Sequence, residues 1–306
     1  MEIKTVTLVG LGAVGAPVAS SINKAVGKEN LFCLVDDERK HRYEKDGIFI
    51  NEEKQDFNLV TPDKASVTDL VIIATKNLQL AQVLGQLKNS VGPDTVILSL
   101  LNGIQSERDI AAVFGAEKVL YGYIVGINSI HVKNQITCPG CGTTVFGEKS
   151  NEKSQRVLAV SKLFEQAKMG YRIPENIELE MWKKFHMNVC FNTLSALLNA
   201  TYGAFTLEPL KQLSRSVSQE IVAVAKSEGI ALTSQIVEDQ LKFFEENEPW
   251  GKTSMHQDIE AGRKTENQWF CGTIEKLGAA HNIPTPYCSL LKQLITSKEA
   301  VNDYKI

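Results

Sequence analysis

The first fifteen residues limit the possible fold more than any other stretch. Residues Val6 to Val9 suit a buried strand, and they run directly into the pattern Gly10-x-Gly12-x-x-Gly15. Gly10 can turn the chain off the strand, Gly12 lets a pyrophosphate approach bare backbone, and Gly15 lets a helix pack closely. The helix that follows presents unpaired N–H groups to phosphates. A structural glycine turn is the alternative, but we predict a dinucleotide site made by Gly10, Leu11, Gly12, Ala13, Val14 and Gly15.

Composition narrows the class of protein. A chain of 306 residues with 43% apolar and 23% charged residues is long enough for two ordinary globular domains. A net charge of −3 argues against a nucleic-acid partner. No apolar run reaches the roughly 18 residues that span a membrane. Because a strand is predicted almost from Met1, we expect no signal peptide. We expect a cytoplasmic protein with no membrane partner.

Six cysteines are scattered along the chain, and only Cys138 and Cys141 are closely spaced. A zinc site would need a second such pair or histidines in range, and His131 is the one nearby candidate. We therefore predict no metal site and interpret this segment as a tight turn with reduced thiols.

The charged residues after the second predicted strand bear on the choice between NAD(H) and NADP(H). Asp36 follows the apolar run 31–35, where an acid can hydrogen-bond the adenosine ribose hydroxyls and favour NAD(H). Arg39 follows closely, with Lys40 and Arg42, and could instead pair with the 2′-phosphate of NADP(H). A solvated charged turn would explain most of this run without any ligand.

Two further buried strands are predicted at 69–74 and 95–101, and each ends in polar residues. Ligands of open α/β sheets gather outside the carboxyl ends of strands. Lys76 and Asn102 are therefore candidates for the site by position, although a helix-start lysine and a turn asparagine are ordinary alternatives. The alternation of strands and helices predicts a mostly parallel, doubly wound sheet.

The pattern changes twice further along the chain. Short β segments at 119–127, 129–136 and 143–146 predict an antiparallel extension of the sheet, before a helix at 154–168 and a strand at 171–173. After Pro174 only helical periodicity remains. We predict a dinucleotide-binding domain at 1–174 and a helical substrate domain at 175–306, with helices at 178–198, 209–228, 234–245, 254–281 and 287–300.

The predicted helix 178–198 carries an unusual polar stripe. Lys184, Asn188 and Asn192 are spaced four apart among apolar neighbours, so they drift by only about 40° per step around the helix. Buried polar groups need partners, and an inter-helix polar seam or a ligand could supply them. Burial would lower the pKa of a lysine here and make it a competent proton donor for carbonyl reduction.

A second polar cluster begins near residue 252. Ser254 and Gln257 fit a helix capping box, which is the structural explanation for them. On a helix over 254–281, Asp258 and Glu266 would lie on nearly the same face because eight residues separate them.

Together these motifs resemble the ketopantoate reductase family over nearly the whole chain. The resemblance lies in the glycine pattern, Thr75-Lys76, Asn102-Gly103, Lys184 with Asn188 and Asn192, and the run from Thr253 to Glu266. It implies an α/β Rossmann-like dinucleotide-binding domain followed by an all-α C-terminal domain, and reduction of ketopantoate to pantoate in pantothenate and coenzyme A biosynthesis. Another branched 2-oxoacid as substrate, or a non-catalytic nucleotide-binding protein, are the alternatives.

The resemblance also implies roles for single residues. Lys184 would be the general acid, and Glu266 would assist it and bind the substrate hydroxyl. Asn188, Asn192 and Ser254 would hold the substrate, while Lys76 and Asn102 would lie where cofactor and substrate meet. The family uses NADP(H), but Asp36 precedes Arg39 here, which makes NAD(H) an alternative. Apolar faces of the C-terminal helices could support a homodimer.

Overall fold

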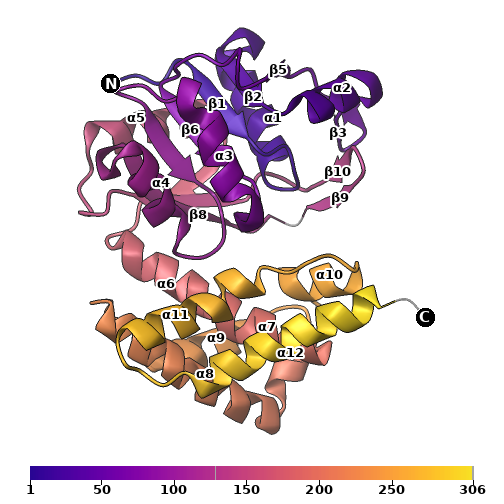
Figure 1. The fold of residues 1–306 in the computed structure, drawn as a ribbon, viewed down its shortest axis with the longest axis vertical. Coiled ribbons are helices and arrows are strands. Elements are labelled where there is room, and N and C mark those ends of the chain that lie inside the picture. The colour runs from indigo at the N-terminus through magenta and orange to yellow at the C-terminus, as the bar shows by residue number, and fades with distance from the viewer. Residues whose placement is uncertain (128, 305–306) are drawn as a thin grey trace. The chain divides into compact units, whose positions relative to one another are not determined.

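The computed structural model describes residues 1–127 and 129–304, which form two compact units (Figure 1). The first comprises Met1–Asn102 with Ser106–Ile177, and the second comprises Gly103–Gln105 with the described residues from Glu178 onward. All strands of the described residues lie in the first unit, and the second is helical. The predicted fold class, a Rossmann-like α/β domain followed by a helical domain, is confirmed.

The first unit is built on a sheet with the strand order β12-β11-β8-β7-β6-β1-β2-β5 in the described residues. Neighbours from β5 to β8 pair in parallel, and β11 is antiparallel to β8. The order reverses beside β1, which is the point where such sheets bind ligands. The strands are β1 (Val6–Val9), β2 (Leu31–Leu34), β5 (Asn58–Val60), β6 (Leu70–Ile73), β7 (Val96–Ser99), β8 (Val119–Val125), β11 (Thr143–Gly147) and β12 (Gly170–Arg172).

Helices cover both faces of this sheet, because its central strands are apolar on both sides. Along β6, Leu70 and Ile72 pack in the cluster that includes α1 and α5, whereas Val71 and Ile73 pack in the cluster that includes α3 and α4. These helices are α1 (Gly15–Val26), α3 (Leu80–Gln86), α4 (Ser106–Phe114) and α5 (Gln155–Gln166), and short 3₁₀ turns lie at Lys28–Asn30, Asn77–Gln79, Leu87–Asn89 and Ala116–Lys118.

The predicted antiparallel extension is right for β11 and wrong for residues 129–136. These residues form β9 and β10 of a separate sheet with the order β4-β3-β10-β9. Its other two strands, β3 and β4, come directly after α2 (Asp37–Asp46) in the chain. Asn134 holds the two segments together, because its side chain donates to the carbonyl of Asp46 at 2.8 Å and its carbonyl accepts from Phe49 N–H at 2.9 Å. The strands are β3 (Phe49–Ile50), β4 (Glu53–Lys54), β9 (Ile130–Val132) and β10 (Gln135–Thr137).

The second unit packs its helices around a phenylalanine cluster. The ring centroids of Phe191, Phe205 and Phe244 lie 4.6–5.2 Å apart. Buried Glu220 accepts the N–H groups of Tyr287 and Cys288, and so caps the last helix. The elements are α6 (Ile177–Met187), the π-helix η5 (Asn188–Asn192), α7 (Thr193–Leu198), η6 (Tyr202–Thr206), α8 (Glu208–Ser227), α9 (Gln235–Glu246), α10 (Ser254–Glu260), η7 (Asn267–Trp269), α11 (Cys271–Ala280) and α12 (Pro286–Asp303).

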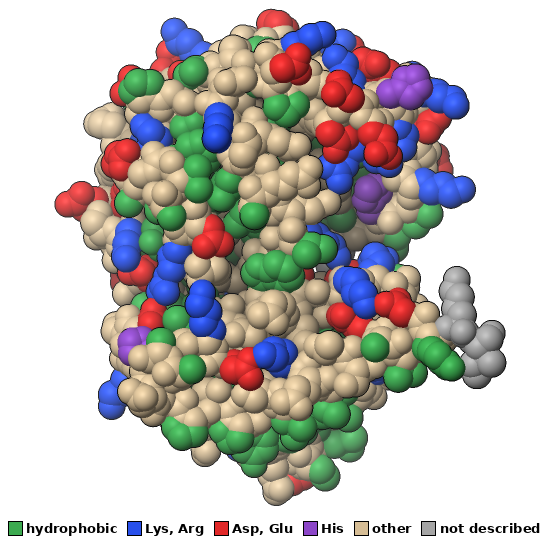
Figure 2. All heavy atoms as spheres, in the orientation of Figure 1, with side chains coloured by type: hydrophobic (Ala, Val, Ile, Leu, Met, Phe, Trp, Pro, Cys, Tyr) green, Lys and Arg blue, Asp and Glu red, His purple; other side chains and the backbone are tan. Residues whose placement is uncertain are grey.

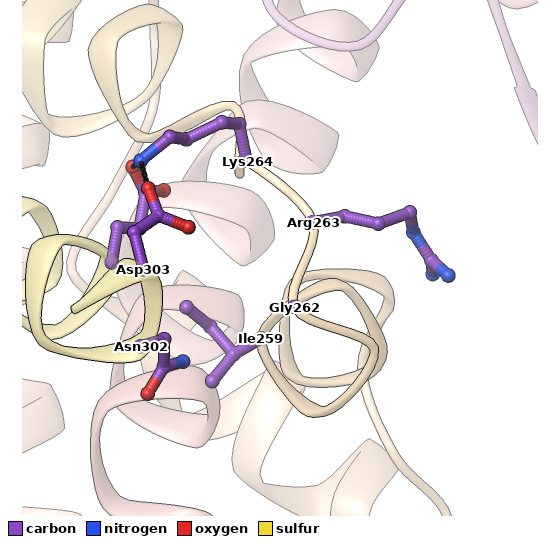
Figure 3. A pocket seen from close by; sticks show the side chains of 7 residues that line it. Ile259, Gly262, Arg263, Lys264, Asn302 and Asp303 are labelled. Carbon is purple, nitrogen blue, oxygen red and sulfur yellow. Dashed lines mark hydrogen bonds and ion pairs between the residues drawn. The ribbon is translucent and has the colours of Figure 1, made fainter. Parts of the chain in front are cut away.

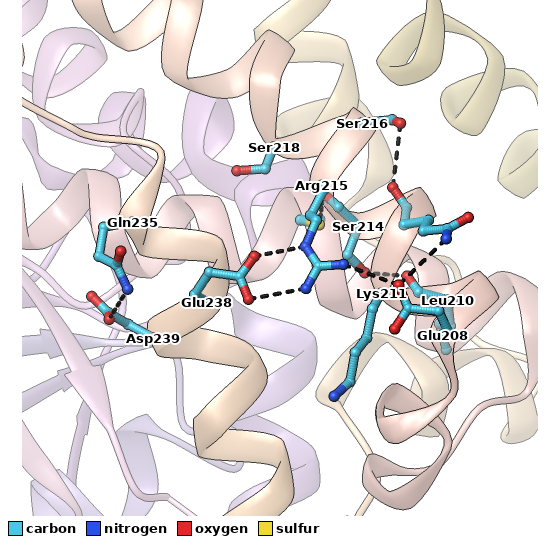
Figure 4. Close-up of polar contacts among 12 residues, drawn as sticks. Glu208, Leu210, Lys211, Ser214, Arg215, Ser216, Ser218, Gln235, Glu238 and Asp239 are labelled. Atoms are coloured by element: carbon cyan, nitrogen blue, oxygen red, sulfur yellow. Dashed lines mark hydrogen bonds and ion pairs between the residues drawn. The ribbon is translucent and has the colours of Figure 1, made fainter.

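Ion pairs join α8 to α9 at the surface of this unit. Arg215 donates to both carboxylate oxygens of Glu238, at 2.7 and 3.1 Å (Figure 4). On the face of the molecule in Figure 2, acidic and basic side chains are interspersed. None of the helices in the described residues is long and apolar enough to cross a bilayer.

Candidate active site

The glycine loop after β1 has the geometry that its pattern predicts. Gly10 has a φ of +102°, and a Cβ there would lie 2.6 Å from the carbonyl oxygen of Ala74. A Cβ on Gly15 would lie 1.8 Å from the carbonyl oxygen of Gly10. Both positions therefore exclude any side chain. A Cβ on Gly12 would meet nothing within 4 Å, so the chain leaves open space where the pattern expects a pyrophosphate.

The N-terminus of α1 is chemically suited to an anion. The helix has no side-chain cap and no acidic residue in its first turn. Its first N–H groups and its dipole are therefore offered to a negatively charged ligand. Together with the open space at Gly12, this end of α1 fits the phosphates of a dinucleotide.

The carboxyl ends of β6 and β7 place further polar residues at the same edge of the sheet. Lys76 is exposed directly after β6, and Asn77 donates its side-chain N–H to the carbonyl of Asn102 at 2.9 Å. This bond ties the loop after β6 to the loop after β7. Thr75, which we did not predict as a site residue, has a buried hydroxyl without a hydrogen-bond partner in the described residues. The sequence signal that could have identified Thr75 is its position just after the fully buried strand β6.

Asp36 and Arg39 contact each other. Asp36 is the N-cap of α2, and one carboxylate oxygen accepts the N–H of Arg39 at 2.7 Å. The second oxygen lies 3.2 Å from the Arg39 guanidinium. Both side chains are partly exposed, so they remain accessible at the end of β2. The acid and the base that we predicted as alternatives for the ribose thus form one ion pair.

In the second unit, Lys184 lies on α6 beside fully buried Phe185. It is half-buried, and burial lowers the pKa of its ammonium below the ordinary 10.5. Among the described residues its ammonium makes no hydrogen bond or ion pair, whereas the neighbouring Lys183 pairs with Glu180 at 2.8 Å. Within this part of the chain, Lys184 is therefore a lysine without a carboxylate to hold its proton.

The two asparagines lie on a π-helical turn that the four-residue spacing did not reveal. Asn192 donates to the side-chain oxygen of Asn188 at 3.0 Å, and both side chains are buried. The side-chain N–H₂ of Asn188 is buried without a partner in the described residues. π-turns occur frequently at functional sites, and an unpartnered buried donor costs about 1–3 kcal/mol. A ligand carbonyl or carboxylate would satisfy it.

Ser254 joins these asparagines, because Asn192 also approaches its hydroxyl at 3.5 Å. Thr253, and not Ser254, caps α10, since the Thr253 hydroxyl accepts the N–H of His256 at 3.3 Å. The predicted capping box at Ser254 is wrong. The exposed hydroxyl of Ser254 is therefore available for a ligand.

A single helix over 254–281 is also wrong. α10 ends in a Schellman motif, in which Gly262 has a φ of +65° and Arg263 N–H bonds to the carbonyl of Asp258 at 2.8 Å. Because α10 ends at Glu260, Asp258 does not share a helix face with Glu266, and it pairs with Arg263 instead. Glu266 lies in the turn before η7, and its carbonyl accepts the N–H of Trp269 at 2.9 Å.

A buried histidine, His186, anchors the helix that carries Lys184. Its two ring nitrogens, Nδ1 and Nε2, contact the Gln240 side-chain oxygen at 2.6 Å and the Ser218 hydroxyl at 2.7 Å. Gln240 uses its N–H₂ on the carbonyl of Lys183, so the oxygen faces His186 and Nδ1 carries the proton. Burial lowers the pKa of His186 to about 4, which keeps the ring neutral. This network fixes α6 on α8 and α9.

No group of three histidine, cysteine or carboxylate side chains in the described part of the chain could hold a metal ion. The thiols of Cys138 and Cys141 are free, and Cys141 contacts the hydroxyl of Ser21 at 2.9 Å.

Comparison with known proteins assigns the chain to a family. Residues 6–151 match the family described as ketopantoate reductase PanE/ApbA, and residues 176–299 match its C-terminal part. The chain belongs to the ketopantoate reductase family. It is 27% identical over 304 residues to a 2-dehydropantoate 2-reductase of Streptococcus pyogenes serotype M1, which covers 97% of this chain and 98% of that one. It is also 27% identical over 294 residues to the uncharacterized oxidoreductase YkpB of Bacillus subtilis strain 168, with 92% and 96% covered.

Solved structures share the fold of this family member. A D-mandelate dehydrogenase in a ternary structure with NADH and anilino(oxo)acetate superposes with a TM-score of 0.87 at 21% identity, covering 98% of this chain and all of that one. A dimeric ketopantoate reductase from Staphylococcus aureus gives 0.79 at 19% identity, with 97% and 99% covered. The family is one of oxidoreductases, as the sequence motifs predict.

Proposed function

We propose that this protein reduces a 2-oxoacid with a nicotinamide dinucleotide, and that ketopantoate is the substrate and pantoate the product. The observation that carries the proposal is the unpartnered amide of Asn188, one helical turn after the unpaired Lys184. Membership of the ketopantoate reductase family supports the chemistry. The NADH in the ternary mandelate dehydrogenase structure supports the cofactor.

The first unit would hold the cofactor. The residues proposed for it are Gly10, Leu11, Gly12, Ala13, Val14 and Gly15 around the phosphates, Asp36 and Arg39 at the adenosine ribose, and Lys76 with Asn102 near the nicotinamide. When bound, the reduced dinucleotide supplies a hydride to the carbonyl carbon of the substrate.

The second unit would supply the proton and the substrate contacts. Lys184 donates a proton from its ammonium to the carbonyl oxygen as charge builds there, and Glu266 assists it. Asn188, Asn192 and Ser254 hydrogen-bond the substrate and fix its orientation. The product is a 2-hydroxy acid, and Lys184 regains its proton from solvent.

The test is reduction of ketopantoate with NADH and with NADPH in parallel, followed by the loss of reduced-cofactor absorbance. Turnover that Lys184→Ala lowers by at least about 100-fold supports the proposal. Wild-type turnover in that variant would remove Lys184 as the acid. Tight cofactor binding without turnover on any 2-oxoacid would favour the non-catalytic alternative.

The second candidate is a reductase of another branched or aromatic 2-oxoacid. The observation that favours it is the likeness to mandelate dehydrogenase, whose ternary structure holds NADH and anilino(oxo)acetate. A substrate panel that includes phenylglyoxylate, the oxoacid related to mandelate, would separate the two.

The cytoplasmic location and the homodimer stay predictions. Light scattering of the purified protein would test the dimer, which the dimeric Staphylococcus aureus protein supports.

A further inference from the structure

We propose that Glu299 on α12 is a positioning residue for Glu266, because it fixes the turn from which Glu266 projects. This inference rests on the proposed role of Glu266 in the reaction. It assigns a function to a carboxylate 33 positions further along the chain, on a helix that carries none of the predicted site residues.

Glu299 holds the residue immediately before Glu266. One of its carboxylate oxygens accepts both the N–H of Thr265, at 2.9 Å, and the Thr265 hydroxyl, at 2.6 Å. The Glu299 side chain is only 15% exposed, so these charge-assisted bonds are sheltered from water. Two bonds from one residue to one oxygen fix the backbone and the side chain of Thr265 together.

The residue immediately after Glu266 is held by the same helix. Asn267 is buried, and its side-chain N–H₂ donates to the carbonyl of Lys292 at 2.8 Å. The N–H of Asn267 also donates to the Thr265 hydroxyl at 3.3 Å. The Thr265 hydroxyl therefore links Glu299 to the far side of Glu266, and the turn is fastened to α12 on both sides.

This arrangement decides where the Glu266 carboxylate can lie. The backbone of Glu266 adopts φ −92° and ψ 22°, and its carbonyl accepts from Trp269 and Phe270. With the backbone held before, at and after residue 266, the place of the carboxylate depends on the side-chain torsions of Glu266. Catalytic groups lose rate steeply when their supports let them move by an ångström.

A neighbouring ion pair provides a matched control. Lys264 pairs with Asp303 at 2.6 Å and lies farther, 3.8 Å, from the second carboxylate oxygen of Glu299. These three side chains line a hollow together with Ile259, Gly262, Arg263 and Asn302 (Figure 3). In that view Arg263 points away from the pair. Both partners are 58% exposed, and they join the same loop to the same helix. Asp303→Asn removes this charge contact and leaves the bonds between Thr265 and Glu299 intact.

The experiment compares Glu299→Ala, Glu299→Gln and Asp303→Asn in the full-length protein, with ketopantoate or the best 2-oxoacid of the panel. We expect Glu299→Ala to lower kcat/KM about tenfold, with cofactor affinity unchanged. Glu299→Gln keeps an acceptor oxygen and should stay within about twofold of the wild type, as should Asp303→Asn. If the negative charge of Glu299 merely stabilised the fold, Glu299→Gln would lower kcat/KM as much as Glu299→Ala does.

A double-mutant cycle with Glu266→Gln tests whether Glu299 acts through Glu266. Glu299→Ala should cost nothing further once the Glu266 carboxylate is gone. Full additivity, or wild-type activity of Glu299→Ala beside an impaired Glu266→Gln, would overturn this inference alone. Wild-type activity of Glu266→Gln would instead overturn the proposed role of Glu266, and this inference with it.

Thr265→Val and Thr265→Ser extend the test if Glu299→Ala does not fold. Valine keeps the shape of threonine but removes the hydroxyl that links Glu299 to Asn267, and serine keeps it. The inference requires the serine variant to retain activity that the valine variant loses. Equal activity of the two variants would contradict it.

Discussion

Asn192 donates a side-chain N–H to the side-chain oxygen of Asn188 at 3.0 Å, while the N–H₂ of Asn188 itself has no partner in the described residues. The bond fixes the Asn188 amide with its donor side unused. The π-turn that carries both residues contributes to this, because its wider turn leaves Asn192 less rotated past Asn188 than an α-helix would. A donor that is aligned, buried and unsatisfied is suited to a ligand oxygen.

Replacing this donor should separate binding from stability. Asn188→Leu removes the unsatisfied amide but also takes away the acceptor of the Asn192 side chain, 3.0 Å away. Because these two effects are opposite in sign, we expect the free energy of unfolding to stay within about 1 kcal/mol of the wild type. The KM for the 2-oxoacid should rise at least about tenfold, because the substrate loses a buried hydrogen bond. Urea unfolding and steady-state kinetics measure the two effects. An unchanged KM would exclude Asn188 from the substrate site.

The pH dependence of kcat should report Lys184. The acid form of its ammonium is needed, so kcat falls as the pH rises through the pKa of Lys184. Because burial lowers that pKa, the fall should occur below pH 10.5. Lys184→Arg keeps a charge that does not titrate in this range, and should lower kcat while removing the alkaline fall. Retention of the same alkaline fall in Lys184→Arg would assign the titration to another group.

The sequence predicted most of the fold because its signals are local. The residues within each segment are enough to predict the strands β1, β2, β6 and β7 and the glycine turn from Gly10 to Gly15. Residues 129–136 were misplaced because β10 takes as its partner β3, more than 80 positions earlier. Periodicity within a segment carries no information about such a partner.

The site was less predictable because side-chain partners decide it. Lys184, Asn188 and Asn192 follow from their spacing, but the π-turn and the unpartnered Asn188 amide do not. The break after α10 was missed even though Gly262 supplies the left-handed residue that ends many helices. Apolar residues on both sides of that break continue the helical period, and this outweighed one glycine.

The ion pair of Asp36 and Arg39 should control cofactor choice. A 2′-phosphate would have to compete with Asp36 for the guanidinium, and the carboxylate would repel it. Asp36→Asn keeps an oxygen that can cap α2, so the helix should remain. We expect the ratio of kcat/KM for NADPH over NADH to rise about tenfold. Asp37→Asn removes the same charge from the next, exposed position, and a rise of equal size there would point to net charge alone.

Glu107, at the start of α4, should make the protein less stable in mild alkali. It is fully buried, its carboxyl oxygens have no hydrogen-bond partner in the described residues, and burial raises its pKa from 4.5 to about 8. Ser106 lies close enough to favour the ionised form, but burial outweighs it. Between these two pKa values the folded protein holds a proton that the unfolded chain has released. Stability from this group is therefore full below about pH 4.5 and is lost as the pH rises through 8.

Glu107→Gln keeps the size of the protonated carboxyl and cannot ionise. We expect it to match the wild type near pH 5 and to exceed its free energy of unfolding by about 2–4 kcal/mol at pH 8. Buried His186 works in the other direction, because its pKa is lowered to about 4 and its contribution is lost as the pH falls from 6.5 to 4. Urea unfolding between about pH 6.5 and 8.5 thus isolates Glu107. A variant whose stability falls with pH as steeply as that of the wild type would show that Glu107 does not hold this proton.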